Sequence, residues 1–513
     1  MRLAQPTSAS GARSNRDWSA RLRSCFPSAL IVVVAVGMLG YSLVHLDLAA
    51  FARDEPQFLA AAQGQLRTGH WLSANPFYGN VGLRYGPSAF WFYGAVQYLF
   101  GADPHIAILA MGLMITLAHL MLAFALTDLF AGGAVFFGVL LAWIASSPYQ
   151  FYWSRLAWDL TSNAGVAWAV VLLCLCRELR PGAILTLGVL LGLAFSTHPS
   201  VTPFLAAVGI ALAWELRSQT GRLAAVGGLL ATAILSVSAP YLFFLLSAPV
   251  VQRTPRVPVS LGAVASLLLE SPRVATTWGL GYLFGGDWTD FLKWLGPAAI
   301  SVPLLSGLGL TGCVVGSVTG LATTLTASDP RQRRVASTAL LAWTGSVLLL
   351  AMLGLEHHPH YQFSSAWVPV YGVAASVAWL RRRKPRAGTV ALAVLGAIAL
   401  AQFVVIVQWM GYVRERGGTR GGPYSTPLGV QIRAIQAVCS VPEPVIILWN
   451  ETAMYPYAFE YLATTDGACH GKTVVVCAPT PNSLTKTCPP RTEAVRLRRL
   501  SYASEKGGAL RVE

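Results

Sequence analysis

The sequence predicts an α-helical polytopic membrane protein that ends in a small extracytoplasmic α/β domain. Three observations predict this fold class. Of the 513 residues, 54% are hydrophobic and only 12% are charged, which is about half the charged fraction of an average soluble protein. Apolar runs of bilayer-spanning length recur as far as residue 412. Beyond that residue the chain becomes polar and contains two short strand-like runs.

About eleven apolar runs have the length and composition of transmembrane helices. The first follows a basic N-terminal segment, residues 1–25, and is too long for the apolar part of a cleaved signal peptide, so we expect it to be retained. The runs lie near 26–51, 104–127, 131–147, 160–176, 182–197, 201–216, 223–247, 297–325, 336–355, 364–380 and 388–412. No internal repeat is visible, so the sequence does not support an inverted-repeat transporter.

The distribution of Lys and Arg predicts the orientation of these spans. If the N-terminus is cytoplasmic, the short segments that face the cytoplasm hold nearly half of the 37 basic residues, and the longer opposite loops hold far fewer. The positive-inside rule requires this asymmetry. The net charge of +15 therefore reflects membrane topology, and we expect no nucleic-acid partner. An odd number of spans places the tail outside. The Arg- and Ala-rich composition suggests a GC-rich bacterial genome, and we expect the protein in the inner membrane.

The tail, residues 413–513, is expected to be an extracytoplasmic α/β domain. Its strand-like runs are Pro444–Trp449 and Thr473–Cys477. It also holds an even number of cysteines, which in an oxidising compartment favours two disulfides of open connectivity. These cysteines are Cys439, Cys469, Cys477 and Cys488.

The first extracytoplasmic loop, residues 52–103, is long for a simple connection, so we expect it to have structure of its own. It opens with Asp54, Glu55 and Pro56. Proline suits the first turn of a helix and aspartate suits its cap. The apolar residues of 56–69 fall on one side, which predicts a helix lying in the membrane interface. Asp54 is then either a simple cap or a catalytic base at the water–lipid boundary.

A second acid, Asp159, lies at the outer end of the fourth span, four residues after Arg155. Residues at this spacing share a helix face, so the two side chains are expected to be able to pair. One interpretation is a structural ion pair at the membrane boundary. The other is a second acid of an active site.

Three histidines and a tyrosine follow the ninth span: His357, His358, His360 and Tyr361. They invite a zinc interpretation, but Pro359 breaks the helix and the i, i+4 spacing of a helical zinc pair is missing. We therefore predict no metal site here. His and Tyr donors that bind a phosphate or a substrate hydroxyl fit the pattern better.

Arg84 is the basic residue of the first loop nearest to this predicted active surface, and a dense aromatic run, residues 90–100, follows it. Such a run is typical of an interfacial belt, and it would also flank a lipid-linked substrate. The sequence lacks a phosphate-binding Walker motif, a glycine-rich dinucleotide loop and a nucleophile elbow. Nucleotide-driven and hydrolase-type mechanisms therefore lack their usual parts.

Together these features resemble the GT-C superfamily of integral-membrane glycosyltransferases. Along the sequence, these features occur in the following order: an acid pair after the first span, an interfacial helix, a basic residue close to a proline, an aromatic run and Leu99–Gly101. The nearest branch holds the protein O-mannosyltransferases and the lipid A aminoarabinose transferases, a glycosyltransferase family 39-like group. The resemblance covers residues 26–412. It implies that these residues form a GT-C-like transmembrane catalytic domain.

The resemblance implies transfer of a hexose or pentose from a polyprenyl-phosphate donor to an extracytoplasmic glycan, lipid or protein. It assigns the base to Asp54, with Glu55 as its neighbour, and it matches a later acid to Asp159. Many relatives have a lysine directly before the proline where this chain has Gly86, so Arg84 is expected to supply the missing charge.

The remaining candidate donors to the lipid phosphate are Arg155, His357, His358, His360 and Tyr361. Phosphate leaving groups need such donors beside the bilayer, because negative charge develops as the bond to the sugar breaks. The resemblance implies no cofactor, and a divalent cation stays open because some branches of the superfamily need one. A polytopic lipid or solute transporter, such as a flippase, is the alternative function; it explains the spans but not the acids outside them.

Overall fold

The computed structural model describes most of the membrane-spanning part of the chain and several pieces of the tail. The described residues are 15–51, 54–76, 84–158, 164–247, 260–284, 287–354, 359–419, 426–440, 445–448, 456–465, 469, 474–478, 486–487, 500–503 and 509–512. Asp159, His357, His358 and Cys488 lie outside these ranges.

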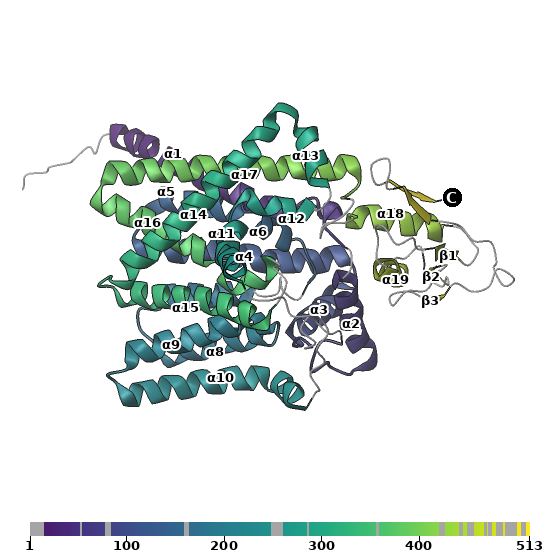
Figure 1. The fold of residues 1–513 in the computed structure, drawn as a ribbon, viewed down its shortest axis with the longest axis horizontal. Coiled ribbons are helices and arrows are strands. Elements are labelled where there is room, and N and C mark those ends of the chain that lie inside the picture. Colours follow the sequence, from purple (N-terminus) through teal and green to yellow (C-terminus); the bar gives the residue numbers. More distant parts are fainter. Residues whose placement is uncertain are drawn as a thin grey trace, which may run out of the picture.

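Long helices arranged side by side form the body of the molecule (Figure 1). Each apolar run noted in the sequence overlaps one of them. They are α1 (Asn15–Gly40), α4 (Pro104–Phe130), α5 (Gly133–Ala145), α7 (Ala164–Leu175), α8 (Pro181–Phe195), α9 (Thr202–Leu216), α10 (Thr220–Ser247), α14 (Ser301–Leu325), α15 (Pro330–Leu353), α16 (Val368–Arg383) and α17 (Pro385–Arg416).

By length and composition, six helical segments among the described residues can cross a membrane. They are Pro104–Phe130, Pro199–Leu216, Thr220–Ser247, Trp288–Leu325, Pro330–Leu353 and Pro385–Arg416. Four further apolar helices in the same ranges are shorter: Ser28–Leu43, Gly133–Ala145, Ala164–Leu175 and Pro181–Phe195. The chain is thus a multi-pass membrane protein, and the count of eleven spans stays a prediction.

Local sequence signals explain where several helices begin and end. The side chain of Asp103 accepts a hydrogen bond from the backbone N–H of His105, and Pro104 follows as the first helical residue of α4. Asp329 caps α15 in the same way, with Pro330 after it. These are favoured N-terminal residues because the carboxylate satisfies a backbone donor that the helix leaves open. Gly354 ends α15 in the left-handed conformation, with φ of 59°.

The first helix is shorter than the apolar run that predicted it. α1 ends at Gly40, and the chain continues through two short 3₁₀ turns, η1 (Tyr41–Leu43) and η2 (Leu46–Leu48). His45 between them has a positive φ of 54°. Hydropathy did not show this end, because residues 41–51 remain mostly apolar and their non-helical backbone depends on distant partners.

Close packing between helices depends on small residues. A Cβ atom on Gly320 of α14 would lie 2.1 Å from the carbonyl oxygen of Gly372 in α16, so no side chain fits there. Such residues let helix backbones approach closely, which is a common means of helix association in membranes.

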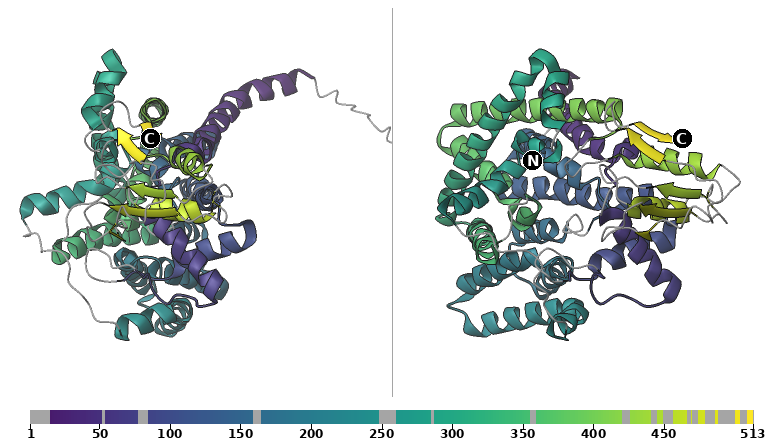
Figure 2. Two further views of the ribbon diagram at one scale, coloured as in Figure 1. Left: turned by 90° about the vertical axis from the view of Figure 1, so that its right-hand side faces the viewer. Right: turned by 45° about the vertical axis from the view of Figure 1, so that its right-hand side comes forward.

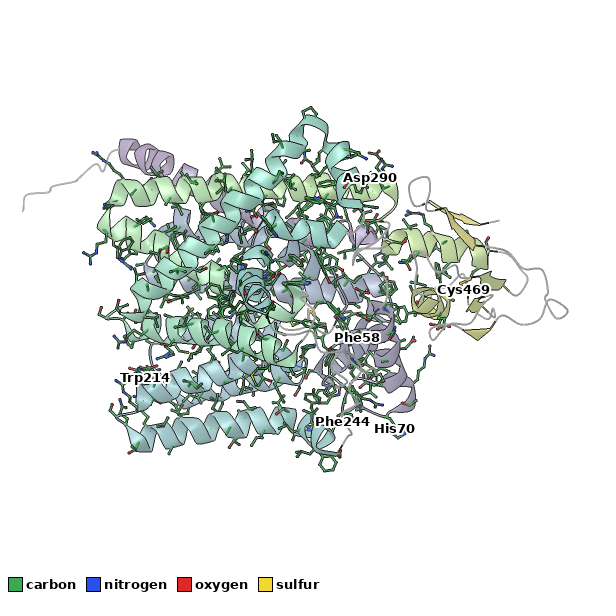
Figure 3. The ribbon with its side chains drawn as sticks, in the orientation of Figure 1. Phe58, His70, Trp214, Phe244, Asp290 and Cys469 are labelled. Carbon is green, nitrogen blue, oxygen red and sulfur yellow. A yellow bond between two sulfur atoms is a disulfide. The ribbon has the colours of Figure 1, made fainter. Side chains whose placement is uncertain are left out.

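The two ends of the bundle differ in what they carry (Figures 1 and 3). One end, at the left in both figures, holds the α16–α17 turn and the labelled Trp214 near the end of α9. The other end holds the labelled Phe58, His70, Phe244 and Cys469. We call the first the turn end and the second the first-loop end, because α2 (Asp54–Thr68) and α3 (Ser88–Phe100) of the first loop lie there.

A set of shorter helices lies outside the main runs. They are α6 (Pro148–Trp153), α11 (Leu261–Val274), α12 (Leu280–Phe284) and α13 (Trp288–Leu295), with the 3₁₀ turns η4 (Pro199–Val201), η5 (Thr277–Gly279), η7 (Gly296–Ile300) and η8 (Pro359–Ser365).

The tail continues from α17 at the first-loop end (Figure 2). Its elements are α18 (Leu428–Cys439), β1 (Val445–Leu448), α19 (Pro456–Thr465), β2 (Val474–Ala478), β3 (Lys486–Thr487), β4 (Leu500–Ala503) and β5 (Ala509–Val512). The first two strands pair in parallel, with Val445 opposite Val474, and β3 extends that sheet. β4 and β5 form a separate antiparallel pair. The two runs expected to be strands are therefore β1 and β2.

One disulfide joins the tail elements, between Cys439 at the end of α18 and Cys469, which follows α19. It is one of the pairings that the sequence left open. The side chains of Cys477 and Cys488 are not among those described, so the second disulfide stays a prediction.

Candidate functional site

Asp54 opens α2 directly after a segment that the tail holds in place. The carbonyl of Ala49 accepts a hydrogen bond of 2.9 Å from the backbone N–H of Leu428. Ala50 forms an isolated antiparallel bridge with Pro427. The amide of Gln431 donates to the carbonyl of Phe51. We call these contacts the tail clamp; they fix the backbone of residues 49–51, which precede the acid pair in the chain.

The apolar face of α2 is covered by protein, although the sequence predicted a helix lying in the membrane interface. Phe58 stacks on Phe90 of α3, with 4.9 Å between ring centroids. The Nε2 group of Gln97 in α3 donates to the carbonyl of Leu59 at 3.0 Å. Glu55 is only 6% exposed. The first loop therefore folds as a helix pair against the bundle, and it presents Asp54 from a packed element.

α19 of the tail completes this arrangement. The hydroxyl of Tyr461 donates to the carbonyl of Ala102 at 2.7 Å, just beyond the end of α3. Its ring also lies against Phe51, with 6.0 Å between centroids. Phe51 is fully buried. The tail thus contacts both sides of the acid-bearing segment.

Arg84 lies at the start of a short segment, residues 84–88, that leads into α3. Its carbonyl accepts a 3.0 Å hydrogen bond from the hydroxyl of Tyr241 in α10. Its guanidinium carbon lies 5.9 Å from the centroid of the Phe244 ring, within the range of a cation–π contact. Backbone and side chain of Arg84 are therefore both placed against the outer part of α10.

Gly86 explains the departure from the lysine expected before the proline. A Cβ atom at Gly86 would lie 1.9 Å from the carbonyl oxygen of Ser196, at the end of α8. The backbone N–H of Ser88 donates to that same carbonyl at 3.2 Å. Since any side chain at position 86 would collide with backbone, lysine is excluded from this packing.

Arg155 has a structural role that the sequence did not reveal. It is 1% exposed, and its guanidinium donates to the carbonyls of Ser42, Val44 and His45, with 3.0 Å and 2.6 Å to the first two. A buried guanidinium needs such partners, and these carbonyls are left open where α1 has ended. Arg155 therefore fixes the connection from α1 towards α2. Its contact with a donor phosphate stays a prediction, as does its pairing with Asp159.

η8 carries the described part of the histidine cluster. Tyr361 is 7% exposed and packs with Leu267, Val347 and Leu350. The next residue, Gln362, joins a buried hydrogen-bond network with Ser271 of α11. The side chain of His360 is not described. The structure therefore anchors η8 against α11 and α15, while the roles of His357, His358, His360 and Tyr361 towards a donor stay predictions.

An ion pair in α11 was missed by sequence reasoning. Arg273 donates to the carboxylate of Glu270 at 2.7 Å, and both side chains are largely buried. The guanidinium carbon also lies 5.6 Å from the Trp278 ring centroid. The sequence signal for this pair was an acidic and a basic residue three positions apart in an otherwise apolar run.

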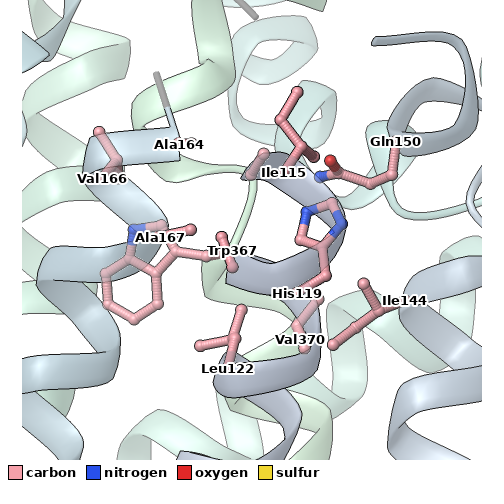
Figure 4. A pocket seen from close by; sticks show the side chains of 12 residues that line it. Ile115, His119, Leu122, Ile144, Gln150, Ala164, Val166, Ala167, Trp367 and Val370 are labelled. Carbon is pink, nitrogen blue, oxygen red and sulfur yellow. The ribbon is translucent and has the colours of Figure 1, made fainter. Parts of the chain in front are cut away.

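A cavity within the helices contains one polar pair (Figure 4). His119 of α4 and Gln150 of α6 face each other there. The rest of the lining is apolar and includes Ala164 and Ala366. Ala164 begins α7 directly after the segment that holds Asp159, and Ala366 directly follows η8. The cavity therefore lies at the start of α7 and next to the end of η8.

Within the part of the chain that the structure describes, no three His, Cys, Asp or Glu residues are grouped to hold a metal ion.

Comparison with known proteins gives a likeness to solved structures. No protein-family model matches the chain, and no curated protein sequence does. The crystal structure of ArnT from Cupriavidus metallidurans bound to undecaprenyl phosphate is 11% identical, with a TM-score of 0.49, over 91% of this chain and 87% of that one.

Two further solved structures are similar. The apo crystal structure of the same ArnT has a TM-score of 0.44 and 16% identity, over 88% of this chain and 89% of that one. The cryo-EM structure of arabinofuranosyltransferase AftD from Mycobacteria has a TM-score of 0.39 and 14% identity, over 89% of this chain but only 32% of that one. At these values the likenesses transfer no residue role, donor or acceptor to this chain.

Proposed function

We propose that this protein transfers a sugar from a polyprenyl-phosphate donor to a glycan, lipid or protein acceptor outside the cytoplasm, with Asp54 as the general base. One observation carries the proposal. Asp54 and Glu55 open a packed helix at the first-loop end of the bundle, directly after a backbone segment held by the tail clamp. Scarce charge in so apolar a protein, held on a rigid support, is typical of an active site.

The chemistry is a single displacement. The Asp54 carboxylate takes the proton of the acceptor hydroxyl or amine as that atom attacks the anomeric carbon. The bond between that carbon and the phosphate oxygen breaks, and polyprenyl phosphate leaves from the opposite face, so the anomeric configuration inverts. A positioned base of this kind contributes about 10²–10⁴-fold in rate.

The leaving phosphate needs positively charged donors. Arg84 and Arg273 are the described candidates, and His357, His358 and His360 are the predicted ones. Such groups act most strongly where water is excluded, because they oppose the charge that develops on the phosphate as the bond breaks. Tyr361, Glu55 and Asp159 complete the proposed site, the last as a second acid.

The proposed placement in the cell follows from the same two ends. We infer a bacterial inner-membrane protein with about eleven spans, a cytoplasmic N-terminus and an extracytoplasmic α/β tail. Supporting observations are the basic turns at one end of the bundle and the disulfide at the other, since disulfides persist in oxidising compartments.

One observation favours the alternative, a lipid or solute transporter. His119 and Gln150 form a polar pair in a cavity within the helices, and ionisable residues inside a membrane often mark a transport pathway. Against it, Asp54 and Glu55 lie at the end of the bundle, where a transporter gains little from them.

A strain that lacks the protein tests the proposal. We expect mass spectrometry of its surface glycans and lipids to show loss of one sugar, restored by the wild-type gene and not by Asp54→Asn. Asp290→Asn is the matched control, because Asp290 lies at the same end in a surface ion pair with Lys293. Restoration by Asp54→Asn would contradict the proposed base. An unchanged envelope in the deletion strain, together with a change in lipid distribution, would favour the transporter.

A further inference from the structure

The segment 84–88 is packed directly against the turn between α8 and α9, residues 196–198. The hydrogen bond from Ser88 to the carbonyl of Ser196 and the tight approach of Gly86 join their backbones. The rings of Tyr85 and His198 are also in contact, with 4.1 Å between centroids. We call this contact the loop–turn joint.

Three buried polar side-chain atoms in the loop–turn joint have no hydrogen-bond partner among the described residues. They are Ser88 Oγ, Ser196 Oγ and His198 Nε2. Ser196 is fully buried and His198 is 4% exposed. Buried polar atoms without partners are rare in folded proteins and need an explanation. Three of them in one contact, next to Arg84, indicate a surface built to bind something polar.

The protonation of His198 defines what it offers. Its Nδ1 accepts a hydrogen bond of 3.1 Å from the backbone N–H of Ser200, so the proton of the neutral ring lies on Nε2. Burial lowers the pKa of His198 to about 3, which keeps the ring neutral at physiological pH. The joint therefore presents one neutral N–H donor and two hydroxyls, each able to donate and accept.

We propose that the loop–turn joint is the subsite for the hydroxyl groups of the donor's sugar. This inference rests on the proposed function. The neutral N–H donor and the two hydroxyls match the hydroxyls of an uncharged sugar, which also donate and accept hydrogen bonds. An anion such as phosphate would bind at the positively charged Arg84 instead. Because Arg84 begins the same segment, phosphate and sugar of one donor can be bound by neighbouring residues. The three atoms are closed off from solvent, so segment 84–88 separates from the turn when the sugar enters.

Binding of two probes by the full-length protein tests this subsite. One probe is undecaprenyl phosphate without a sugar. The other is undecaprenyl phosphate carrying the pentose or hexose that the wild type transfers. The readout is the dissociation constant of the sugar-free probe divided by that of the sugar-bearing probe. This ratio reports the contacts that the sugar alone makes.

We expect Ser196→Ala and His198→Ala each to reduce this ratio on the order of tenfold, the effect of about one lost hydrogen bond. Binding of the sugar-free probe should stay at the wild-type level. His198→Gln, which keeps an N–H donor, should restore part of the ratio. Ser317→Ala is the matched control, because Ser317 is a buried serine of α14 whose Oγ also has no partner among the described residues. The control should leave the ratio unchanged.

Folding does not obscure the result. Removing the hydroxyl of Ser196 breaks no hydrogen bond seen in the described part of the chain, so the thermal midpoint should be unchanged or raised. Wild-type ratios in both Ser196→Ala and His198→Ala would overturn the subsite while leaving the proposed function intact. An equal loss of affinity for both probes would also overturn the sugar subsite and would indicate that the joint has a structural role. If the wild type binds neither probe, the proposed function and the subsite fall together.

Discussion

The two ends of the helix bundle use charge in opposite ways. At the turn end, charged groups are matched to one another. Arg334, 1% exposed at its side chain, pairs with both carboxylate oxygens of Glu215 at 2.6 and 2.7 Å. Arg331 pairs with Asp128 at 3.0 Å, and Arg381 donates to the carbonyl of Gly132 at 2.7 Å. These contacts connect helix ends, and each arginine has an acceptor on another helix or turn.

At the first-loop end, polar groups belong to segments held by distant parts of the chain. Asp54 follows the tail clamp, and Ser88 and His198 lie in the loop–turn joint with buried atoms that no described residue satisfies. The ion pairs of the turn end thus serve stability and topology. The buried atoms of the loop–turn joint cost stability unless a ligand satisfies them, which is what the proposed sugar subsite would do.

The largest expected effect is at Asp54. Asp54→Asn should lower kcat for sugar transfer by about 10²–10⁴-fold, because the amide cannot take the acceptor's proton. Initial rates in detergent or proteoliposomes measure this, with Asp290→Asn as the control. Activity within a few-fold of wild type in a well-inserted variant would return Asp54 to the role of a helix cap.

The disulfide of the tail comes next. Replacing Cys439 and Cys469 together by serine should lower the free energy of unfolding by about 3 kcal/mol, the usual contribution of a closed loop of this size. Because α18 and α19 both contact the segment before Asp54, kcat should fall while the KM for donor changes little. Cys176→Ser changes a free cysteine instead and should do neither. A variant as stable and as active as wild type would show that the clamp does not depend on the disulfide.

A change at the turn end should affect stability alone. Glu215→Ala leaves Arg334 buried without its carboxylate. The expected loss is about 2 kcal/mol, below the range for fully buried pairs, because the Glu215 side chain is 26% exposed. Thermal unfolding and the rate per folded molecule are the two measurements. Glu178→Ala, in an exposed pair with Arg180, is the control. A large loss of specific activity in Glu215→Ala would break the distinction between the ends.

The smallest effect is the pH dependence of His198. Its folded-state pKa of about 3 lies below the ordinary value of 6.5, so below pH 6.5 the unfolded chain takes up a proton that the folded chain does not. Its contribution to stability is therefore present above pH 6.5 and is lost as the pH falls towards 3. Unfolding measured against pH should show a weaker acid loss in His198→Gln than in wild type. Identical profiles would mean that His198 is not buried as described.

Local patterns predicted much of the fold. Apolar length located the long helices, because this signal acts within one element. The Asp–Pro pairs that begin α4 and α15 were local signals that the sequence prediction did not use. The end of α1 at Gly40 was not predicted, since it depends on Arg155, more than a hundred residues away. Apolar periodicity also found α2 but not its partner α3.

The candidate site was predicted less completely. Asp54 and Arg84 stood out as charges in an apolar chain. His198 did not, because a single histidine before a proline is typical of any turn, and its contact with Tyr85 joins segments that no local pattern relates. Gly86 looked like a missing lysine until the packing against Ser196 gave it a steric reason.

The most direct measurement is the fate of the donor in proteoliposomes that contain only this protein, a polyprenyl phosphate carrying a labelled sugar, and an acceptor-bearing envelope extract. We expect free polyprenyl phosphate to appear in step with labelled acceptor, and the new linkage to have the inverted anomeric configuration. A donor that stays intact while it moves between leaflets would contradict sugar transfer and make the protein a transporter.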